Sequence, residues 1–109
     1  MTERGKKYLS DIVIAIDLIK SFTQGINSFE EFSSDLKTQS AVERQLSIIR
    51  EAVNKFKQEC PEELLENTQQ IIGFRNRIIH AYDSIDNSIV WVILNRYLDP
   101  LKQEVTKKL

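Results

Sequence analysis

Apolar residues recur every three or four positions over the first long segment of the chain, roughly Tyr8 to Phe22. The repeating set is Tyr8, Ile12, Ala15, Ile16, Ile19 and Phe22. This spacing predicts an amphipathic helix with one continuous apolar face. At about 100° per residue, Ile14 and Leu18 fall on a different side of that helix. The helix is therefore either central in a bundle or in contact with a second subunit.

Signals for helix ends follow this first segment. Gly25 suits the end of a helix, because glycine tolerates a left-handed backbone. Ser28-Phe-Glu-Glu31 has the pattern of a capping box, in which the serine accepts from a free amide and the glutamate reaches back. These residues predict a short helix that ends at about Asp35.

The clearest amphipathic pattern lies in the middle of the chain, roughly Ala41 to Glu59. Its apolar positions are Val42, Leu46, Ile49, Val53 and Phe56. Thr38 or Ser40 is expected to cap this helix. Cys60-Pro61 is expected to stop it, because a residue before proline avoids the helical conformation. The proline also suits the first turn of a short helix that runs to about residue 66.

Two further helices are predicted in the last third. Thr68 can open one over roughly Gln69 to Tyr82, and residues 83–86 break it. Asp86 can cap the next helix, Asn87 to about Leu98. Its apolar run at 89–94 would suit a buried strand, but no partner strand is expected, so we interpret it as helix. Asp99-Pro100 then restarts a terminal helical piece.

Four substantial helices with short connections predict an all-α fold, an antiparallel four-helix bundle with short extra helices. The length of 109 residues indicates a single domain over 1–109. Three Gly and two Pro are too few for a turn-rich β-sandwich or barrel. We expect no membrane partner, since no apolar stretch approaches the ~20 residues of a membrane span. With no secretory signal and one Cys, the expected location is the cytoplasm.

The counts of charged and metal-binding residues restrict the chemistry. One His and one Cys exclude a zinc site of the Cys/His type built from this chain, so no metal is expected. The formal net charge is -1, which excludes a polycation held on nucleic acid by net charge alone. Any affinity for nucleic acid has to come from a local group of basic residues.

The chemically informative segment is Gly73–Asp83, which contains the only His. On a straight helix Asn76, His80 and Asp83 share one face, so Asn76 or Asp83 could fix the tautomer of the imidazole. Arg77 lies towards the edge of that face. Arg75 and Tyr82 share a different face, and Arg75 is roughly 140° from His80. Either the helix ends near His80, or the site is completed across a dimer interface.

Arginine and histidine without metal ligands suit cleavage of a phosphodiester. The guanidinium offers a fixed fork of donors to a phosphate, and imidazole moves a proton near neutral pH. Together they could assist attack of a ribose 2′-hydroxyl on the adjacent phosphate, which makes RNA the expected substrate. The alternative is a solvated polar helix face with His80 in a local hydrogen-bond network.

The segment Arg75-x-x-x-x-His80-x-Tyr82 matches the Arg-x4-His-x-Tyr motif of HepT-type toxins, a branch of the HEPN superfamily. Ile-Ile-Gly-Phe-Arg-Asn-Arg-Ile-Ile-His, ending at His80, resembles the family's Ile-Gly-Met-Arg-Asn-Arg-Leu-Val-His. The other similar segments, in chain order, are Ser28-Phe-Glu-Glu-Phe, Lys37-Thr-Gln-x-Ala-Val, Glu51-Ala52 and Asp86 to Trp91. The resemblance therefore covers nearly the whole chain.

This resemblance implies an all-α HEPN bundle that forms a homodimer with the motif helices at the interface. It implies a metal-independent ribonuclease with no cofactor, in which Arg75 and His80 are catalytic; Asn76, Arg77 and Asp83 are expected to support them or bind RNA phosphate. It also implies an antitoxin partner, a MntA-type nucleotidyltransferase that transfers AMP from ATP to Tyr82. The alternative role for this tyrosine is packing at a helix end.

The chain departs from the family pattern at two places. The connection Glu59–Ile71 is short and lacks the Pro-Trp that often precedes the Ile-Gly segment. Arg50 replaces the Gly of the family's Gly-Glu-Ala. Two alternatives to a ribonuclease toxin remain: a non-catalytic subunit that binds a nucleotidyltransferase and helps present its substrate, and a plain helical dimerisation module.

Overall fold

The computed structural model describes residues 1–73, 78–79 and 84–109 of the chain. The helices are α1 (Glu3–Phe22), α2 (Phe29–Ser33), α3 (Leu36–Glu59), α4 (Gln69–Ile72), α5 (Asn87–Arg96) and α6 (Leu98–Lys108), and a short ladder pairs β1 (Ile78–Ile79) with β2 (Ser84–Ile85). The predominance of helix confirms the predicted all-α class. The helix expected over 89–94 is also confirmed, as part of α5.

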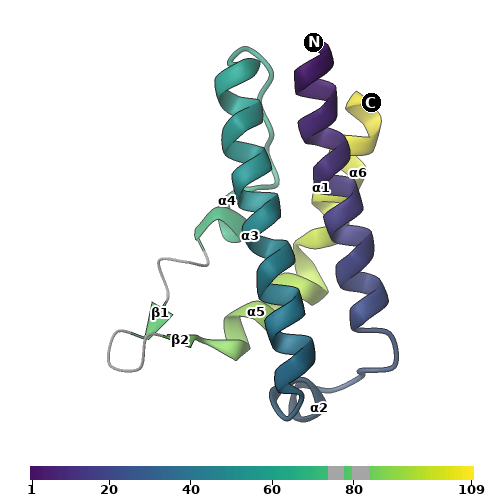
Figure 1. The fold of residues 1–109 in the computed structure, drawn as a ribbon, viewed down its shortest axis with the longest axis vertical. Coiled ribbons are helices and arrows are strands. Elements are labelled where there is room, and N and C mark those ends of the chain that lie inside the picture. Colours follow the sequence, from purple (N-terminus) through teal and green to yellow (C-terminus); the bar gives the residue numbers. More distant parts are fainter. Residues whose placement is uncertain (74–77, 80–83) are drawn as a thin grey trace.

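The bundle is built on α1 and α3, which run antiparallel along the long axis (Figure 1). Their apolar stripes meet in one core that α5 and α6 complete. The buried residues of α1 and α3 are Leu9, Ile12, Ala15, Ile16, Ile19, Val42, Leu46, Ile49, Ala52, Val53 and Phe56. Full burial of each large apolar side chain contributes roughly 1.5–3 kcal/mol. The apolar positions predicted for α3 are all buried, whereas the face predicted for α1 is confirmed only in part, because Phe22 is 38% exposed and the buried Leu9 was not predicted.

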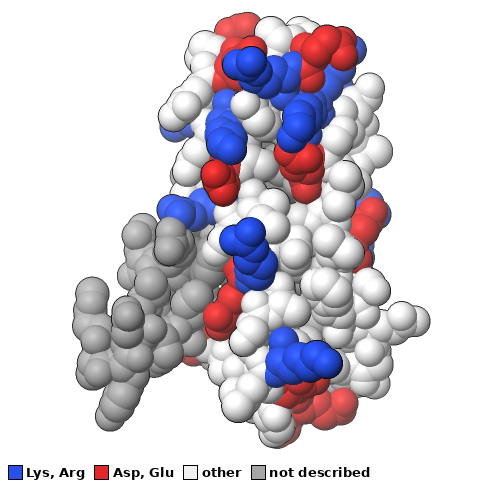
Figure 2. Space-filling view, viewed as in Figure 1, with Lys and Arg blue, Asp and Glu red and all other residues white. Residues whose placement is uncertain are grey.

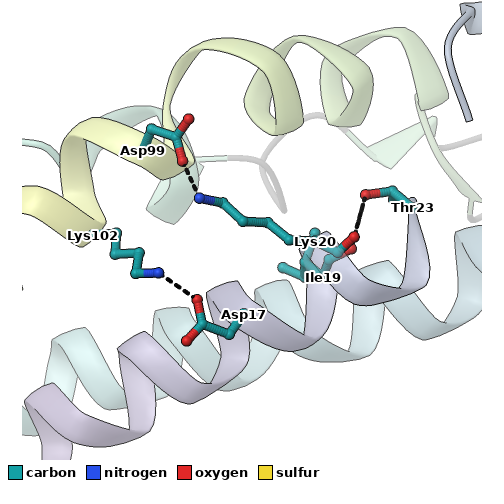
Figure 3. Close-up of polar contacts among 6 residues, drawn as sticks. All are labelled: Asp17, Ile19, Lys20, Thr23, Asp99 and Lys102. Carbon is teal, nitrogen blue, oxygen red and sulfur yellow. Dashed lines mark hydrogen bonds and ion pairs between the residues drawn. The ribbon is translucent and has the colours of Figure 1, made fainter. Parts of the chain in front are cut away.

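Two ion pairs join α6 to α1 at the edge of this core (Figure 3). The ammonium of Lys102 lies 2.7 Å from Asp17 Oδ1, and Lys20 pairs with Asp99. Both pairs are open to solvent, although Lys102 is half-buried, so each pair contributes at most about 1 kcal/mol. Their positions nevertheless fix the register of α6 along α1, which brings both ends of the chain to the same end of the bundle (Figure 1).

Ser28 caps α2 as predicted, but the capping box is present only in part. Ser28 Oγ accepts from the Glu31 amide at 3.2 Å, and the Ser28 hydroxyl, rather than its backbone amide, donates to Glu31 Oε1 at 3.4 Å. Helix α1 ends at Phe22 with Thr23 as its C-cap, not Gly25. Gly25 instead takes a positive φ of 87° in the turn that follows.

Helix α3 begins five residues earlier than expected, because Asp35 caps it instead of Thr38 or Ser40. Asp35 Oδ1 accepts from the Thr38 amide at 3.0 Å, and Oδ2 accepts from the Thr38 hydroxyl at 2.7 Å. These two bonds, the hydroxyl bond foremost, lower the pKa of Asp35. Thr38 is therefore the third helical residue of α3.

The short helix predicted from Pro61 to about residue 66 is wrong; this stretch is a turn followed by irregular chain. The reason is a distant partner. Glu104 on α6 accepts from the backbone amides of Glu66 and Asn67 at 2.7 and 3.0 Å. Those amides donate to a carboxylate 38 and 37 positions away, respectively, rather than to the carbonyls of a local helix.

The helix predicted from Gln69 to Tyr82 is also wrong in its extent. Helix α4 ends at Ile72, and β1 and β2 pair antiparallel, with Ile78 opposite Ile85 and Ile79 opposite Ser84. β-branched isoleucines favour such a ladder. The fourth substantial helix of the bundle is therefore α6. No helix within the described residues has the length and apolar character to cross a membrane.

Candidate functional site: a frame around residues 73–86

The segment that contains the motif leaves the bundle at α4, which is anchored against α3. Ile71 is fully buried, and Thr68 is buried with its hydroxyl donating to Leu65 O at 3.5 Å. Thr68 and Ile72 line a small apolar hollow of about 140 Å³ together with Val53 and Phe56 of α3. The chain therefore enters this segment beside the C-terminal half of α3.

The segment rejoins the bundle at the start of α5, where Asp86 is the N-cap as predicted. Its Oδ1 accepts from the Ser88 hydroxyl at 2.6 Å and from the Ser88 amide at 2.9 Å. The hydroxyl bond is the largest cause of the lowered pKa of Asp86, followed by the amide bond. The cap fixes the position at which β2 turns into α5.

One buried amide ties this end of the segment to α3. Gln39 is 7% exposed, and its Nε2 donates to Phe32 O of α2 at 2.7 Å. Its Oε1 accepts from Asn87 Nδ2, the first residue of α5, at 3.0 Å. Nearby, the rings of Phe32 and Trp91 pack with centroids 5.5 Å apart. Gln39 thus holds α2, α3 and α5 together where the segment returns.

Both anchors are residues of α3. Val53 and Phe56 hold α4, and Gln39 holds α5. At 100° per residue, positions 39, 43 and 50 fall within about 40° of each other, so Glu43 and Arg50 lie on the side of α3 that carries Gln39. Both side chains are half-buried. Burial raises the pKa of the Glu43 carboxyl above its ordinary value.

A second hollow borders the segment between α4 and α5. It has a volume of about 280 Å³ and is lined by Gln70, Ser88, Ile89, Val92, Ile93 and Tyr97. Val92 is 40% exposed. The hollow is lined by apolar side chains, one amide and two hydroxyls, and it lies close to the junction between β2 and α5.

The predicted site residues lie outside the described residues: they are Arg75, Asn76, Arg77, His80, Tyr82 and Asp83. The structure describes the frame around them, through α4, the β1–β2 ladder and α5. The sequence argument gave no structural role to Gln39, which belongs to that frame, or to Glu43 and Arg50, which lie on the same side of α3. Their signal was the spacing of 4, 7 and 11 positions, which places polar groups together on a helix with an apolar core face.

Basic and acidic side chains are interspersed over the face formed by α1 and α3 (Figure 2). Three of the exposed apolar side chains also belong to α1: Ile14 is 58% exposed, Leu18 is 39% exposed and Phe22 is 38% exposed. Within the described part of the chain α1 is therefore not covered on both sides. Of the two sequence interpretations of Ile14 and Leu18, the central position in the bundle is wrong.

Comparison with known proteins agrees with this frame. The family model for HepT-like ribonucleases matches residues 12–107. The chain is 39% identical over 111 residues to the "Probable ribonuclease HepT" of Thermococcus cleftensis, covering 98% of this chain and 97% of that protein. It is 32% identical over 104 residues to the "Putative RNase MJ0127" of Methanocaldococcus jannaschii, covering 90% and 82%. No solved structure matches significantly.

The fold and the frame thus define a small all-α protein in which residues 73–86 connect α4 to α5. The chain belongs to the HepT-like ribonuclease family. The family resemblance stated from the motif is confirmed. RNA is accordingly the substrate that the family indicates.

Proposed function

We propose that the protein is the toxin of a toxin–antitoxin pair, a cytoplasmic, metal-independent endoribonuclease. The observation that carries this proposal is the complete Arg75-x4-His80-x-Tyr82 pattern in a chain that belongs to a ribonuclease family over nearly its whole length. Arg75 and His80 are the catalytic residues in this proposal. No cofactor takes part.

The proposed reaction is an internal transfer within RNA. His80 removes the proton of a ribose 2′-hydroxyl, and the 2′-oxygen attacks the adjacent phosphorus. The bond from phosphorus to the 5′-oxygen of the next nucleotide breaks, and that oxygen takes up a proton from water. Arg75 stabilises the charge that develops on the phosphorane oxygens. The products are a 2′,3′-cyclic phosphate and a 5′-hydroxyl.

Three neighbours support these two residues in the proposal. Asn76 or Asp83 holds the imidazole of His80 in one tautomer, and Arg77 binds a flanking phosphate. The described frame favours such a role for the segment, because both of its ends are anchored to α3. A site held by buried anchors keeps its geometry better than a free loop.

We also propose a homodimer, with the sites of two chains near each other. The exposed apolar stripe of Ile14, Leu18 and Phe22 on α1 supports self-association, since such stripes are typical of contact surfaces. A dimer would double the His and Arg available to one RNA strand.

Regulation in this proposal comes from a MntA-type nucleotidyltransferase antitoxin that modifies Tyr82. The phenolic oxygen attacks the α-phosphorus of ATP, pyrophosphate leaves, and the phenolic proton passes to solvent. The AMP group adds negative charge and bulk beside a site for RNA phosphates, so it repels and occludes the substrate. With a net charge of -1, the protein has little other attraction for RNA to offset this loss.

A second candidate function is a non-catalytic subunit that binds a minimal nucleotidyltransferase and presents its substrate. The near-neutral charge favours it, because such a chain has little general affinity for RNA. It predicts a stable complex with the transferase and no RNA cleavage by the unmodified chain.

The two candidates separate in one experiment. Purified protein is incubated with RNA in EDTA, next to His80→Ala and the matched control Arg44→Ala, an exposed residue of α3. The ribonuclease proposal predicts cleavage by the wild type and the control and none by His80→Ala. Equal cleavage by His80→Ala would refute it. Coexpression with a neighbouring nucleotidyltransferase, followed by mass spectrometry, tests for one added AMP on Tyr82.

A further inference from the structure

The hollow between α4 and α5 (the α4–α5 hollow) has the size and the lining of a site for one small ligand. Its volume is about 280 Å³, just below the range of about 300–1,000 Å³ that is typical of small-molecule sites. Three side chains of α5 form its apolar side: Ile89, Val92 and Ile93. The half-buried Tyr97 also lines it. Because Val92 is 40% exposed, a ligand in the hollow would bury apolar surface that is now open to solvent.

The polar groups of the α4–α5 hollow are uncharged. No Asp, Glu, Lys or Arg is among the described residues that line it, so the hollow does not favour a phosphate or a carboxylate. Gln70 is the exposed residue on its α4 side, and the side-chain amide can both donate and accept hydrogen bonds. An apolar side chain from another protein would bury this amide without a partner, which costs free energy. These groups favour a neutral ligand with an apolar face and polar edges.

Ser88 restricts the ligand further, because its hydroxyl proton is already used. The hydroxyl donates to Asp86 Oδ1 at 2.6 Å, and this bond is the largest cause of the lowered pKa that keeps Asp86 ionised at neutral pH. To a ligand in the hollow, the Ser88 oxygen can therefore only offer a lone pair. The amide oxygen of Gln70 is a second acceptor. An amino group that carries two hydrogens can donate to both of these acceptors.

We propose that the α4–α5 hollow binds one base of the RNA substrate and favours a base with an exocyclic amino group. Proteins hold unpaired RNA bases by stacking them on aromatic rings and by hydrogen bonds to their edges, and Tyr97 and Gln70 offer both kinds of contact. Adenine, cytosine and guanine carry an exocyclic amino group, whereas uracil does not.

Two further observations favour RNA as the source of the base. The hollow is bordered by α4 and α5, the helices that precede and follow residues 73–86 in the chain. The formal net charge of -1 gives the chain little general attraction for RNA, so contacts to bases carry more of the affinity. The inference rests on the proposed ribonuclease function and deepens it, because it gives the protein a preference among bases.

The test locates the bound base with strands that lack single bases. A labelled 2′-O-methyl oligoribonucleotide of a sequence that the protein cleaves resists 2′-hydroxyl attack, so its binding to active protein can be followed by fluorescence anisotropy. Strands that are abasic at one position each are titrated with the wild type. At one position, loss of the base is expected to weaken binding about tenfold, as for a stacked base. Adenine, cytosine or guanine at that position should restore the affinity, whereas uracil should leave binding about fivefold weaker through the missing hydrogen bond.

Two variants show whether that base lies in the hollow. Val92→Glu places a larger, charged side chain there and is expected to weaken binding of the intact strand about tenfold, so that loss of the base no longer matters. Gln70→Ala removes the amide and is expected to weaken binding about fivefold.

Each variant has a matched control that is expected to bind like the wild type. Gln69→Ala removes the neighbouring exposed amide of α4, which does not line the hollow. Leu109→Glu makes the same change of charge as Val92→Glu at another exposed apolar residue. It lies at the far end of α6, about 16 Å along the helix axis from Leu98, the residue that follows Tyr97.

The outcomes distinguish this inference from the function on which it rests. If the wild type cleaves RNA but no abasic position weakens binding, or the sensitive position stays sensitive in Val92→Glu, the hollow holds no base and the inference is overturned. Uracil that binds as well as the other three bases also overturns it. If the wild type neither cleaves nor binds RNA, the ribonuclease proposal fails and the inference fails with it. Should Val92→Glu unfold, as circular dichroism would show, Val92→Gln replaces it and faces the same criterion.

Discussion

Asn87 Nδ2 donates to Gln39 Oε1 at 3.0 Å, across 48 positions of the chain. This bond joins the first residue of α5 to the buried face of α3. Because Gln39 also donates to Phe32 O at 2.7 Å, a single amide sets the spacing of three helices. The end of the segment that contains the motif is therefore positioned by a side chain far from it in sequence.

Asn87→Ala is expected to destabilise the protein by about 1 kcal/mol, because it leaves the Gln39 oxygen without this donor. Urea unfolding measures the change. Under conditions where the Asn87→Ala variant is fully folded, we also expect it to cleave RNA more slowly, because α5 no longer holds the end of the segment. Asn95→Ala is the matched control: its amide donates to Trp91 O within α5, at 2.8 Å, and to no other helix of the described structure. Equal cleavage by the two variants would contradict the anchoring role.

Asp86→Ala is expected to cost about 0.5–2 kcal/mol through loss of the N-cap of α5. The folded-state pKa of Asp86 is lowered, chiefly by the Ser88 hydroxyl, so the carboxylate stabilises the fold above its ordinary pKa. That stabilisation is lost as the pH falls through the lowered folded-state value. The difference in free energy of unfolding between wild type and Asp86→Ala should therefore be smaller at about pH 3 than at pH 7, as measured by unfolding curves at both pH values. A constant difference would contradict the account.

Glu43→Gln is expected to stabilise the protein at pH 7. Burial raises the pKa of this carboxyl, so the folded state holds its proton more tightly than the unfolded chain. The stability that goes with this proton is fully present below the ordinary pKa of about 4.3. It is lost as the pH rises through the raised folded-state value. The gain in denaturant midpoint should vanish near pH 4, and the exposed Glu51→Gln should show no gain at any pH.

Gly5→Ala is expected to destabilise the protein by about 1–3 kcal/mol, because a Cβ at this position would lie 2.6 Å from the buried Sγ of Cys60. Smaller sulfur-free side chains should relieve the clash. Thermal unfolding of Gly5→Ala, Cys60→Ala and the double variant completes a cycle. The double variant should be more stable than the sum of the single changes predicts. Strict additivity would show that the two positions do not contact each other.

If the protein forms the proposed homodimer through the exposed apolar stripe of α1, Ile14→Lys is expected to shift it to monomer, because the substitution places a charge within that stripe. Analytical ultracentrifugation measures the shift. Leu64→Lys changes an even more exposed apolar side chain in another region and should leave the dimer intact. Dimers that persist in Ile14→Lys would place the contact elsewhere.

The sequence predicted best where local signals and burial agree. The stripes of α1 and α3, the cap at Ser28 and the cap at Asp86 follow from neighbouring residues alone. The start of α3 could not be predicted from neighbouring residues, because Asp35, Thr38 and Ser40 are all suitable N-cap residues. Gln39 favours the early start, since within α3 its side chain reaches both Phe32 O and Asn87.

The two other errors are the helix predicted from Pro61 and the length of the helix predicted from Gln69. The first has a cause distant in sequence, and the second involves residues that suit a helix and a strand equally. No local pattern shows that Glu104 takes the amides of Glu66 and Asn67. Isoleucines at 78 and 79 suit a helix face as well as a strand, and the partner strand is only two residues long. The motif itself was found from the residues and the family resemblance, whereas its anchors on α3 required the structure.

The most direct test of the proposed chemistry is the identity of the RNA ends that the purified protein produces in EDTA. Mass spectrometry of an oligoribonucleotide product should show a 2′,3′-cyclic phosphate and a 5′-hydroxyl. A single 2′-deoxy substitution at the cleaved nucleotide should block that cut, and His80→Ala should yield no product. Cleavage that persists at the 2′-deoxy position, or in His80→Ala, would contradict 2′-hydroxyl attack assisted by His80.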